Sequence, residues 1–257
     1  MELPRSAALA ARLEVLPSTG STNDELIARA TGPDPWPHLS VVATDTQTRG
    51  RGRLGRTWTA PAGRSLAVSV LLRPGLPLGT LGWLPLLTGL AVARTLAALG
   101  GAARLKWPND VLIGERKACG ILAELLPDGS GVVVGVGVNL TLDEGELPVP
   151  TATSLALEGL DPDPDALLAG VLGELGSLVD RLAAAGGDAI AAGLRDDVVS
   201  ACDTIGRAVR VELPSGEVVH GAATGIDGTG RLEVLPDGAD AGNALHVAAG
   251  DVTHLRY

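Results

Sequence analysis

The chain has 257 residues, 46% of them hydrophobic, which is enough to bury the core of one large domain and of a second, smaller one. Its formal net charge of -10 argues against nucleic acid as a partner, because proteins that bind nucleic acid normally present a basic surface. The two cysteines lie far apart without Cys-x-x-Cys or Cys/His spacing, so they indicate neither a disulfide framework nor a zinc site and fit a reducing cytoplasm.

The first predicted element is a helix over residues 21–30, with the sequence S-T-N-D-E-L-I-A-R-A. Thr22 and Glu25 have the spacing of a capping box at its start. The residues before this helix contain only a short apolar run, which Arg12 and Glu14 interrupt. They therefore do not read as a secretory signal.

Two strands are expected next, over residues 39–44 and 65–72, on either side of a Gly- and Arg-rich loop from residue 47 to 64. A connection of 18 residues inside a compact domain is usually functional. The apolar stretch 81–99 approaches the length of a membrane span. Because it contains Pro, Gly and Arg and has no uninterrupted apolar run, we predict a buried helix instead.

Four short strands are predicted after this helix. The links between them are too short for parallel crossovers, so the sheet should be antiparallel or mixed. The strand signals cover residues 104–107, 111–113, 118–126 and 132–140.

Helical patterns rich in Ala and Leu follow over residues 163–185 and 188–199. Strands beside segregated helices indicate an α+β domain. From residue 205 the pattern changes to short alternating strands, which indicate a small β-barrel. We therefore predict a larger domain over residues 1–203 and a small C-terminal domain over residues 204–257.

Charge is distributed unevenly along the chain. No Asp or Glu occurs between Thr46 and Asn109, whereas this stretch contains nine Arg and Lys residues. Only two residues of the whole chain are lysine, Lys106 and Lys117. A compact ammonium group binds small anions differently from a planar guanidinium, so this placement indicates a basic anion site in an otherwise acidic protein.

The loop segment Q-T-R-G-R-G-R-L-G-R-T-W, residues 47–58, alternates glycine with arginine. Its glycines allow close backbone approach, so the loop could wrap around an anion. The order G-x-G-x-x-G occurs at Gly50, Gly52 and Gly55, but a dinucleotide-binding turn normally opens a helix and lacks four arginines. A polybasic patch that binds nucleic acid is the alternative, although predicted strands bracket the loop.

Two further segments carry candidate chemistry. In K-W-P-N-D, residues 106–110, Lys106 could pair with phosphate while Asn109 and Asp110 orient it or hold a metal-bound water; read alone, the segment is equally a turn. In R-K-A-C-G-I-L-A-E, residues 116–124, Lys117 could cover a carboxylate and then the charge that develops on phosphorus. The alternative is an exposed lysine at a strand edge.

Asparagine and hydroxyl side chains give weaker signals. Asn139 ends an apolar strand, V-V-V-G-V-G-V-N-L, where its side chain could read a purine edge or cap the strand. Ser21, Thr22 and Asn23 read, on their own, as helix caps.

Taken in order, these motifs resemble the bacterial biotin-protein ligases from about Ser21 to Tyr257. The resemblance implies a class II synthetase-like catalytic domain with a mixed or antiparallel sheet, followed by a small SH3-like β-barrel. It also implies a monofunctional ligase, because only 20 residues precede Ser21, too few for an N-terminal DNA-binding domain. The motifs are S-T-N at 21–23, Gln47 with G-R-G-R-L-G-R-T-W at 50–58, K-W-P-N-D at 106–110, K-A-C-G-I-L-A-E at 117–124, G-V-G-V-N at 135–139 and A-T-S-L at 152–155.

The resemblance implies a reaction in two steps. Biotin and MgATP would give biotinyl-5'-AMP and pyrophosphate, and the biotinyl group would then pass to one lysine of a biotin carboxyl carrier protein. Two repelling anions must meet in the first step, so cations have to offset their charge. Neither nucleic acid nor a membrane is expected as a partner, and paired sheet edges could form a homodimer.

The resemblance also implies roles for individual residues. Lys117 and Arg53 would be catalytic, and Mg²⁺ would arrive with ATP near Asp110 without an assigned protein ligand. The residues expected to bind biotin are Ser21, Thr22, Asn23, Gln47, Arg51, Gly52, Arg53, Lys117 and Gly120. Those expected to bind ATP are Arg56, Trp58, Lys106, Asn109, Asp110 and Asn139.

Two other functions remain open from the residues. A lipoate-protein ligase would use the same adenylation chemistry on a different acid, although the G-R-G-R loop and K-W-P-N-D favour biotin. A ligand-sensing module without catalysis would not require a cation at the reacting centre, which both lysines supply. The interpretation as a biotin-protein ligase expects Lys117 and the Gly50–Arg56 segment to share one cavity.

Overall fold

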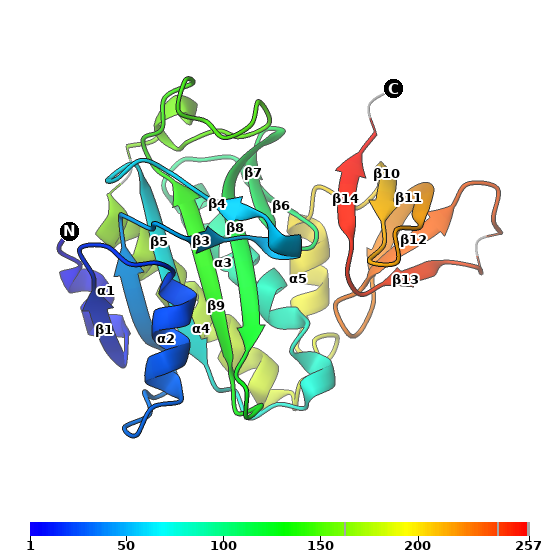
Figure 1. Ribbon diagram of the computed structural model, residues 1–257. Helices are drawn as coiled ribbons and strands as arrows, with labels where there is room; N and C mark the ends of the chain where they lie inside the picture. Colours follow the sequence, from blue (N-terminus) through cyan, green and yellow to red (C-terminus); the bar gives the residue numbers. More distant parts are fainter. Residues whose placement is uncertain (162, 241, 256–257) are drawn as a thin grey trace.

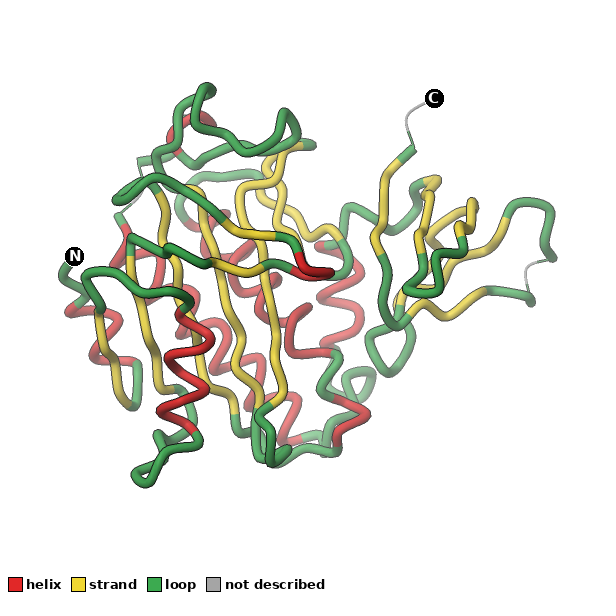
Figure 2. The backbone as a smooth tube through the Cα atoms, in the orientation of Figure 1, coloured by secondary structure: helices red, strands yellow, loops and turns green. Residues whose placement is uncertain are grey.

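The computed structural model describes residues 1–161, 163–240 and 242–255. The predicted C-terminal domain extends to residue 257, so its last two residues lie outside the described part of the chain. Two layers of helix cover one face of a large sheet, and a second, smaller sheet lies beside this body (Figures 1 and 2).

The large sheet contains seven strands in the order β1-β2-β5-β9-β8-β7-β6. Only β1 and β2 run parallel, and the other neighbours are antiparallel, which confirms the predicted mixed sheet. The strands are β1 (Arg12–Val15), β2 (Ser40–Thr44), β5 (Ser65–Leu72), β6 (Ala103–Lys106), β7 (Asp110–Ile113), β8 (Arg116–Leu125) and β9 (Val132–Asn139).

Helices cover the two faces of this sheet unequally. Helix α2 (Thr22–Ala30) lies alone on the front face, whereas α3 (Trp83–Ala98) lies behind the sheet with α4 (Pro164–Ala184) against it (Figure 1). The segment Leu78–Ala98 is long and apolar enough to cross a membrane, but 67% of its apolar window is buried inside the fold. This confirms the predicted buried helix. The remaining helices are α1 (Pro4–Leu9) and α5 (Leu194–Ala201), with 3-10 turns at Leu78–Thr80 and Ala156–Glu158.

The C-terminal part forms a five-stranded antiparallel sheet in the order β13-β12-β11-β10-β14. Two buried tryptophans of the larger body hold it, because Trp83 Nε1 donates to Gly228 O at 2.9 Å and Trp107 Nε1 donates to Gly230 O at 3.1 Å. The strands are β10 (Ala208–Glu212), β11 (Val218–Ile226), β12 (Leu232–Pro236), β13 (Leu245–Val247) and β14 (Asp251–His254).

Some local predictions were wrong. The capping box does not form, because Ser21 is the N-cap of α2 and the Thr22 hydroxyl donates to Gln47 Oε1 at 3.1 Å. The helix predicted over residues 188–199 begins only at Leu194, since Gly193 has a left-handed backbone with φ 68°. Residues before it form turns.

The N-terminal elements α1 and β1 were not predicted. Helix α1 has only six residues, and contacts distant in sequence hold it: the backbone amides of Arg5 and Ser6 each donate to the Asp165 carboxylate at 2.9 Å. Such contacts leave no local signal in the sequence.

Candidate active site

A patch of very small residues on the front face of the sheet forms the floor of the site. Ala67 on β5 pairs with Gly137 on β9, which pairs with Gly120 on β8, so three neighbouring strands lack bulk along one row. A Cβ atom at Gly137 would lie 2.6 Å from the Trp58 ring, and one at Gly135 would lie 2.5 Å from Asn23 Oδ1. The glycines therefore let side chains from other elements lie flat on the sheet.

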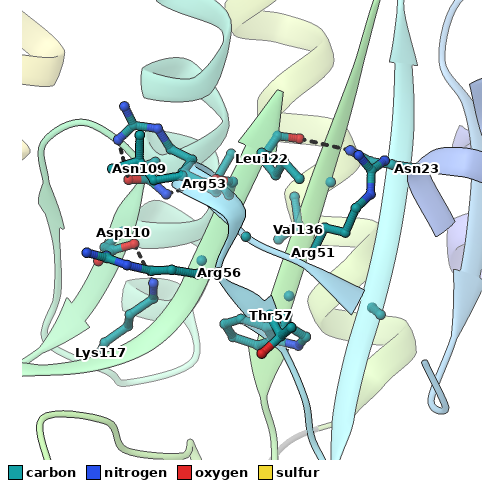
Figure 3. Close-up of a pocket in the computed structure, with 18 of the residues that line it drawn as sticks. Asn23, Arg51, Arg53, Arg56, Thr57, Asn109, Asp110, Lys117, Leu122 and Val136 are labelled. Atoms are coloured by element: carbon teal, nitrogen blue, oxygen red, sulfur yellow. Dashed lines mark hydrogen bonds and ion pairs between the residues drawn. The ribbon is translucent and has the colours of Figure 1, made fainter. Parts of the chain in front are cut away.

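Neutral hydrogen-bonding groups line the end of the floor next to α2. The Thr22 backbone amide donates to Gln47 Oε1 at 2.8 Å, and Ser69 Oγ lies 2.8 Å from Thr22 Oγ1 and 2.6 Å from Asn23 Oδ1. Asn23 Nδ2 donates to Leu122 O at 3.2 Å (Figure 3). These side chains are held before any ligand arrives, so this neutral end is rigid.

The Gly- and Arg-rich loop forms a short hairpin that crosses in front of β8 and β9 (Figure 1). Strand β3 (Gly50–Arg51) pairs with β4 (Thr57–Trp58), and a 3-10 turn at Arg53–Gly55 forms the tip. Leu54 and Gly55 have φ of 56° and 72°, a left-handed conformation that is strained at Leu54. We call residues 50–58 the lid.

Charged groups from four elements meet at the other end of the floor. Lys117 Nζ lies 2.6 Å from Asp110 Oδ1, and Arg53 Nη1 donates to Asn109 Oδ1 at 3.2 Å (Figure 3). Arg56 forms an ion pair with Asp251 at the start of β14. The C-terminal sheet thus contributes a carboxylate to this charged end.

The environment shifts the titration of these groups. Burial lowers the pKa of Arg53, against the attraction of Asp110 and Asp251. The hydrogen bond to Asp251 raises the pKa of Arg56, and the same contact lowers the pKa of Asp251. The positive charges of Lys106 and Arg53 lower the pKa of Asp251 further. The charged end therefore combines several cations with two carboxylates, Asp110 and Asp251, which partly offset its positive potential.

The A-T-S-L segment holds Lys117 in place from below. The Lys117 backbone amide donates to Thr151 O at 2.8 Å, and the Thr153 amide donates to Lys117 O at 2.9 Å. Asn139 belongs to this support, because its buried side-chain amide donates to Thr153 O at 2.8 Å. Asn139 does not line the cavity described next.

One cavity joins the neutral end, the floor, the lid and the charged end. It holds about 930 Å³ of space, a figure that includes the open solvent at its mouth. Lys117 and the lid arginines share it. The residues named from the sequence that line it are Ser21, Thr22, Asn23, Gln47, Arg51, Gly52, Arg53, Arg56, Trp58, Lys106, Asn109, Asp110, Lys117 and Gly120.

Sequence reasoning missed several residues of this cavity. The alternation of glycine with valine in V-V-V-G-V-G-V-N was a usable signal for a floor, because glycine inside a strand often marks a close approach. No local signal marks Asp251, which reaches the site from the C-terminal sheet. The missed lining residues include Leu54, Thr57, Ala67, Leu122, Gly135, Gly137, Asp251 and Val252.

Trp58 has an unusual position between the floor and the cations. Its ring lies on Gly137, and Lys117 Nζ is 5.9 Å from the ring centre. Its indole Nε1 is buried and has no hydrogen-bond partner among the described residues. A buried donor without a partner is destabilising, so this group favours a ligand that brings an acceptor.

Two family models match the chain. Residues 15–139 match the model described as biotin/lipoate A/B protein ligase family, and residues 204–255 match the biotin protein ligase C terminal domain. The first match contains the floor, the lid and both lysines. The second contains Asp251.

Named relatives agree with these models. The biotin--[acetyl-CoA-carboxylase] ligase of Mycobacterium tuberculosis is 41% identical over 95% of this chain and 90% of its own length. The bifunctional ligase/repressor BirA of Escherichia coli is 36% identical over 47% of this chain and 38% of its own length. A solved structure of the biotin protein ligase from Aquifex aeolicus, in complex with biotin and ATP, superposes with a TM-score of 0.78 at 26% identity, covering 96% of this chain and all of that one.

Proposed function

The chain belongs to the biotin protein ligase family, and on that premise we propose that it activates biotin with MgATP and transfers it to a lysine of a biotin carboxyl carrier protein. The observation that carries the assignment of the site is the single cavity that Lys117, the lid and the neutral end share. Biotin has a neutral ureido ring and a carboxylate tail, which matches a cavity with one neutral and one charged end.

The neutral end would receive the ureido ring. Thr22, Asn23 and Gln47 are already held by hydrogen bonds to one another, to Ser69 and to the sheet. Side chains fixed in this way lose little freedom when a ligand binds, which favours affinity and selectivity. The glycine floor lets Asn23 and Trp58 lie against the sheet, where they would border the ring.

The charged end would join the carboxylate to the α-phosphate. The biotin carboxylate oxygen attacks phosphorus, the bond from phosphorus to the bridging oxygen breaks, and pyrophosphate leaves. Lys117 and Arg53 would offset the charge that builds up on the phosphoryl oxygens, and they would hold the two anions close together. In the second step the amine of the carrier lysine attacks the acyl carbon and AMP leaves.

Magnesium would bind at the charged end only together with the phosphates of ATP. No group of three or more His, Cys, Asp or Glu side chains among the described residues could hold a metal ion by itself. Mg²⁺ is commonly bound by one or two carboxylates together with substrate phosphates, and Asp110 could supply such a carboxylate. When bound, the ion would neutralise phosphate charge.

The alternatives are less well supported. Lipoate lacks a ureido ring, so it offers no ring N–H or carbonyl to the polar side chains of the neutral end. A sensing module would not need Lys117 beside the reacting atoms. A role in nucleic-acid binding based on the lid arginines is disfavoured because Arg51 and Arg56 are already paired with carboxylates.

We also propose that the domain boundary lies between residues 203 and 204, and that the second domain closes the nucleotide end through Asp251. The carrier is taken to be the biotin-accepting domain of acetyl-CoA carboxylase, since that enzyme stands in the name of the M. tuberculosis relative. The cytoplasm is the compartment where both would meet. Pairing of sheet edges in a homodimer remains a proposal.

Incubation with ATP, biotin and a carrier domain tests the function. The carrier mass should rise by one biotin when ATP is present, and a carrier whose acceptor lysine is replaced by arginine should stay unmodified. Lipoate in place of biotin should give no product. A mass increase with lipoate alone would favour the lipoate ligase, and ligand binding without any modification would favour the sensor.

A further inference from the structure

Glu124 lies next to the neutral end but has no part in the reaction as described. It ends the R-K-A-C-G-I-L-A-E segment on β8, on the front face with Gly120 and Leu122. Its side chain is 24% exposed. A carboxylate this close to a site for a negatively charged acid is unfavourable unless it serves another purpose.

The contacts of Glu124 join it to the lid. Arg51 Nη1 donates to Glu124 Oε1 and Arg51 Nη2 to Glu124 Oε2, both at 2.8 Å. Two parallel charge-assisted bonds of this kind fix the relative orientation of both groups as well as their distance. Arg51 Nη2 also reaches Asp24 at 2.5 Å, but Asp24 is 64% exposed, so Glu124 is the firmer anchor.

The same carboxylate also binds the neutral end. Asn23 Nδ2 donates to Glu124 Oε2 at 2.6 Å, in addition to its bond to Leu122 O. With both amide hydrogens directed toward β8, Asn23 Oδ1 faces Ser69. Glu124 therefore fixes the orientation of the Asn23 amide, with its nitrogen toward β8 and its oxygen toward Ser69.

One side chain thus connects three elements that a ligand would contact together: the sheet, α2 and the lid. In Figure 3 the Arg51 side chain extends from the lid strand toward Asn23. The guanidinium of Arg51 is occupied by carboxylates. It is therefore placed to fasten the lid and not to bind an anion directly, which differs from the role that the sequence implied.

We propose that Glu124 is a positioning residue, which latches the lid through Arg51 and orients Asn23 for the acid. This rests on the proposed function, because the lid must stay closed while a reactive acyl-adenylate waits for the carrier. Closing the site keeps water from the mixed anhydride. Opening of the lid is then governed at its Arg51 end mainly by the ion pair with Glu124, with the exposed Asp24 as a second partner.

The test compares Glu124→Gln with wild type. The glutamine keeps the shape and one acceptor oxygen but loses the charge, so the lid should open more often. We expect biotinyl-5'-AMP, formed in place from labelled biotin and ATP, to leave the protein about tenfold faster, the scale expected when a charge-assisted hydrogen bond is weakened. Trypsin should also cut after Arg53 or Arg56 in the exposed lid tip sooner than in wild type.

Asp197→Asn is the matched control. Asp197 is a carboxylate of similar exposure, 31%, that also lies between two arginines, 3.1 Å from Arg94 and 3.1 Å from Arg181, but far from the cavity. It should lower stability without changing release of the intermediate or cleavage of the lid. Thermal unfolding of all variants shows that each is folded.

A double-mutant cycle separates the latch from direct binding. If Arg51 acts through Glu124, Arg51→Gln and the double variant should release the intermediate about as fast as Glu124→Gln alone. Effects that multiply, or release from Glu124→Gln at the wild-type rate, would overturn the proposal. If the proposed ligase function is wrong, wild type will form no biotinyl-5'-AMP at all, which distinguishes this outcome from failure of the Glu124 proposal.

Discussion

The two ends of the cavity are built by different means. At the neutral end, Thr22, Asn23, Gln47 and Ser69 hold one another by hydrogen bonds within the larger body. At the charged end, Lys117 comes from β8, Arg53 and Arg56 come from the lid, and Asp251 comes from the C-terminal sheet. The neutral end is thus formed within the larger body, whereas the charged end is assembled from the large sheet, the lid and the C-terminal sheet.

Because the two ends are separate, we expect the largest loss of adenylation rate from a substitution at the charged end. Lys117→Met keeps most of the side-chain volume but removes the charge near the reacting oxygens. Adenylation should slow by about 10²–10³-fold, the usual scale for losing one group that stabilises developing charge. Binding of biotin without ATP should change by far less.

Single-turnover formation of biotinyl-5'-AMP and calorimetric titration with biotin measure these two effects. The double variant Lys117→Met/Asp110→Asn controls for the carboxylate left unpaired. Equal losses in rate and in biotin affinity would show that the two ends are not separate.

At the neutral end, a substitution should weaken biotin binding more than it slows adenylation. Asn23→Ala removes hydrogen bonds to Leu122, Glu124 and Ser69 and leaves the partners buried. Unpaired buried polar groups of this kind cost about 1–3 kcal/mol, so biotin affinity should fall roughly tenfold to a hundredfold. The rate at saturating biotin should stay within a few-fold of wild type, which stopped-flow measurement checks.

Replacing Asp251 should have a smaller effect, and it should improve binding of ATP where the other substitutions impair the enzyme. Its carboxylate lies among the cations that would bind phosphate, so it repels the nucleotide while it pairs with Arg56. Asp251→Asn should lower the KM for ATP by about threefold, a modest change because the pair is partly exposed and screened. Biotin affinity should be unchanged. A raised KM for ATP would show that the Arg56 contact matters more for the lid than the repulsion does.

A final prediction concerns the pH dependence of folding stability and not the reaction. His254 on β14 has 14% of its side chain exposed, lies beside Thr204, and faces Lys106, Arg207, Asp203 and Glu115. Burial, with help from the two cations, lowers the pKa of His254 from 6.5 to about 4.

The unfolded chain therefore binds this proton first, and the stability that neutral His254 provides is complete above pH 6.5 and is lost as pH falls toward 4. The slope is at most about 1.4 kcal/mol per pH unit. Urea unfolding at pH 7.5 and 5.0 should show the loss in wild type and a smaller one in His254→Gln. Equal losses in both would assign the pH dependence to other groups.

The sequence predicted much of the fold, because the strongest elements carry their own pattern. Strand 65–72 and the helix near 81–99 are predominantly apolar, and the structure buries most of both. Helix α1 escaped prediction because bonds to Asp165, far along the chain, hold it. The late start of α5 depends on the left-handed Gly193, which an alanine-rich pattern obscured.

In the candidate site too, residues within local motifs were predicted, whereas a residue that depends on distant packing was missed. Residues in compact motifs, such as Lys117 and the lid arginines, were named from the sequence and line one cavity. Asp251 was not, since only the docking of two sheets brings it near Arg56. Asn139 was expected in the nucleotide pocket; its side-chain amide donates to Thr153 O and it does not line this cavity, so its contact with a nucleotide stays a prediction.

The most direct test of the whole account is the exchange of labelled pyrophosphate into ATP, with and without biotin. The account predicts exchange in wild type that requires biotin and Mg²⁺, that falls by about 10²–10³-fold in Lys117→Met, and that returns to near the wild-type rate in Asn23→Ala when biotin is raised. Exchange that is independent of biotin, or that survives in Lys117→Met, would contradict the claim that this cavity joins biotin to the nucleotide at its charged end.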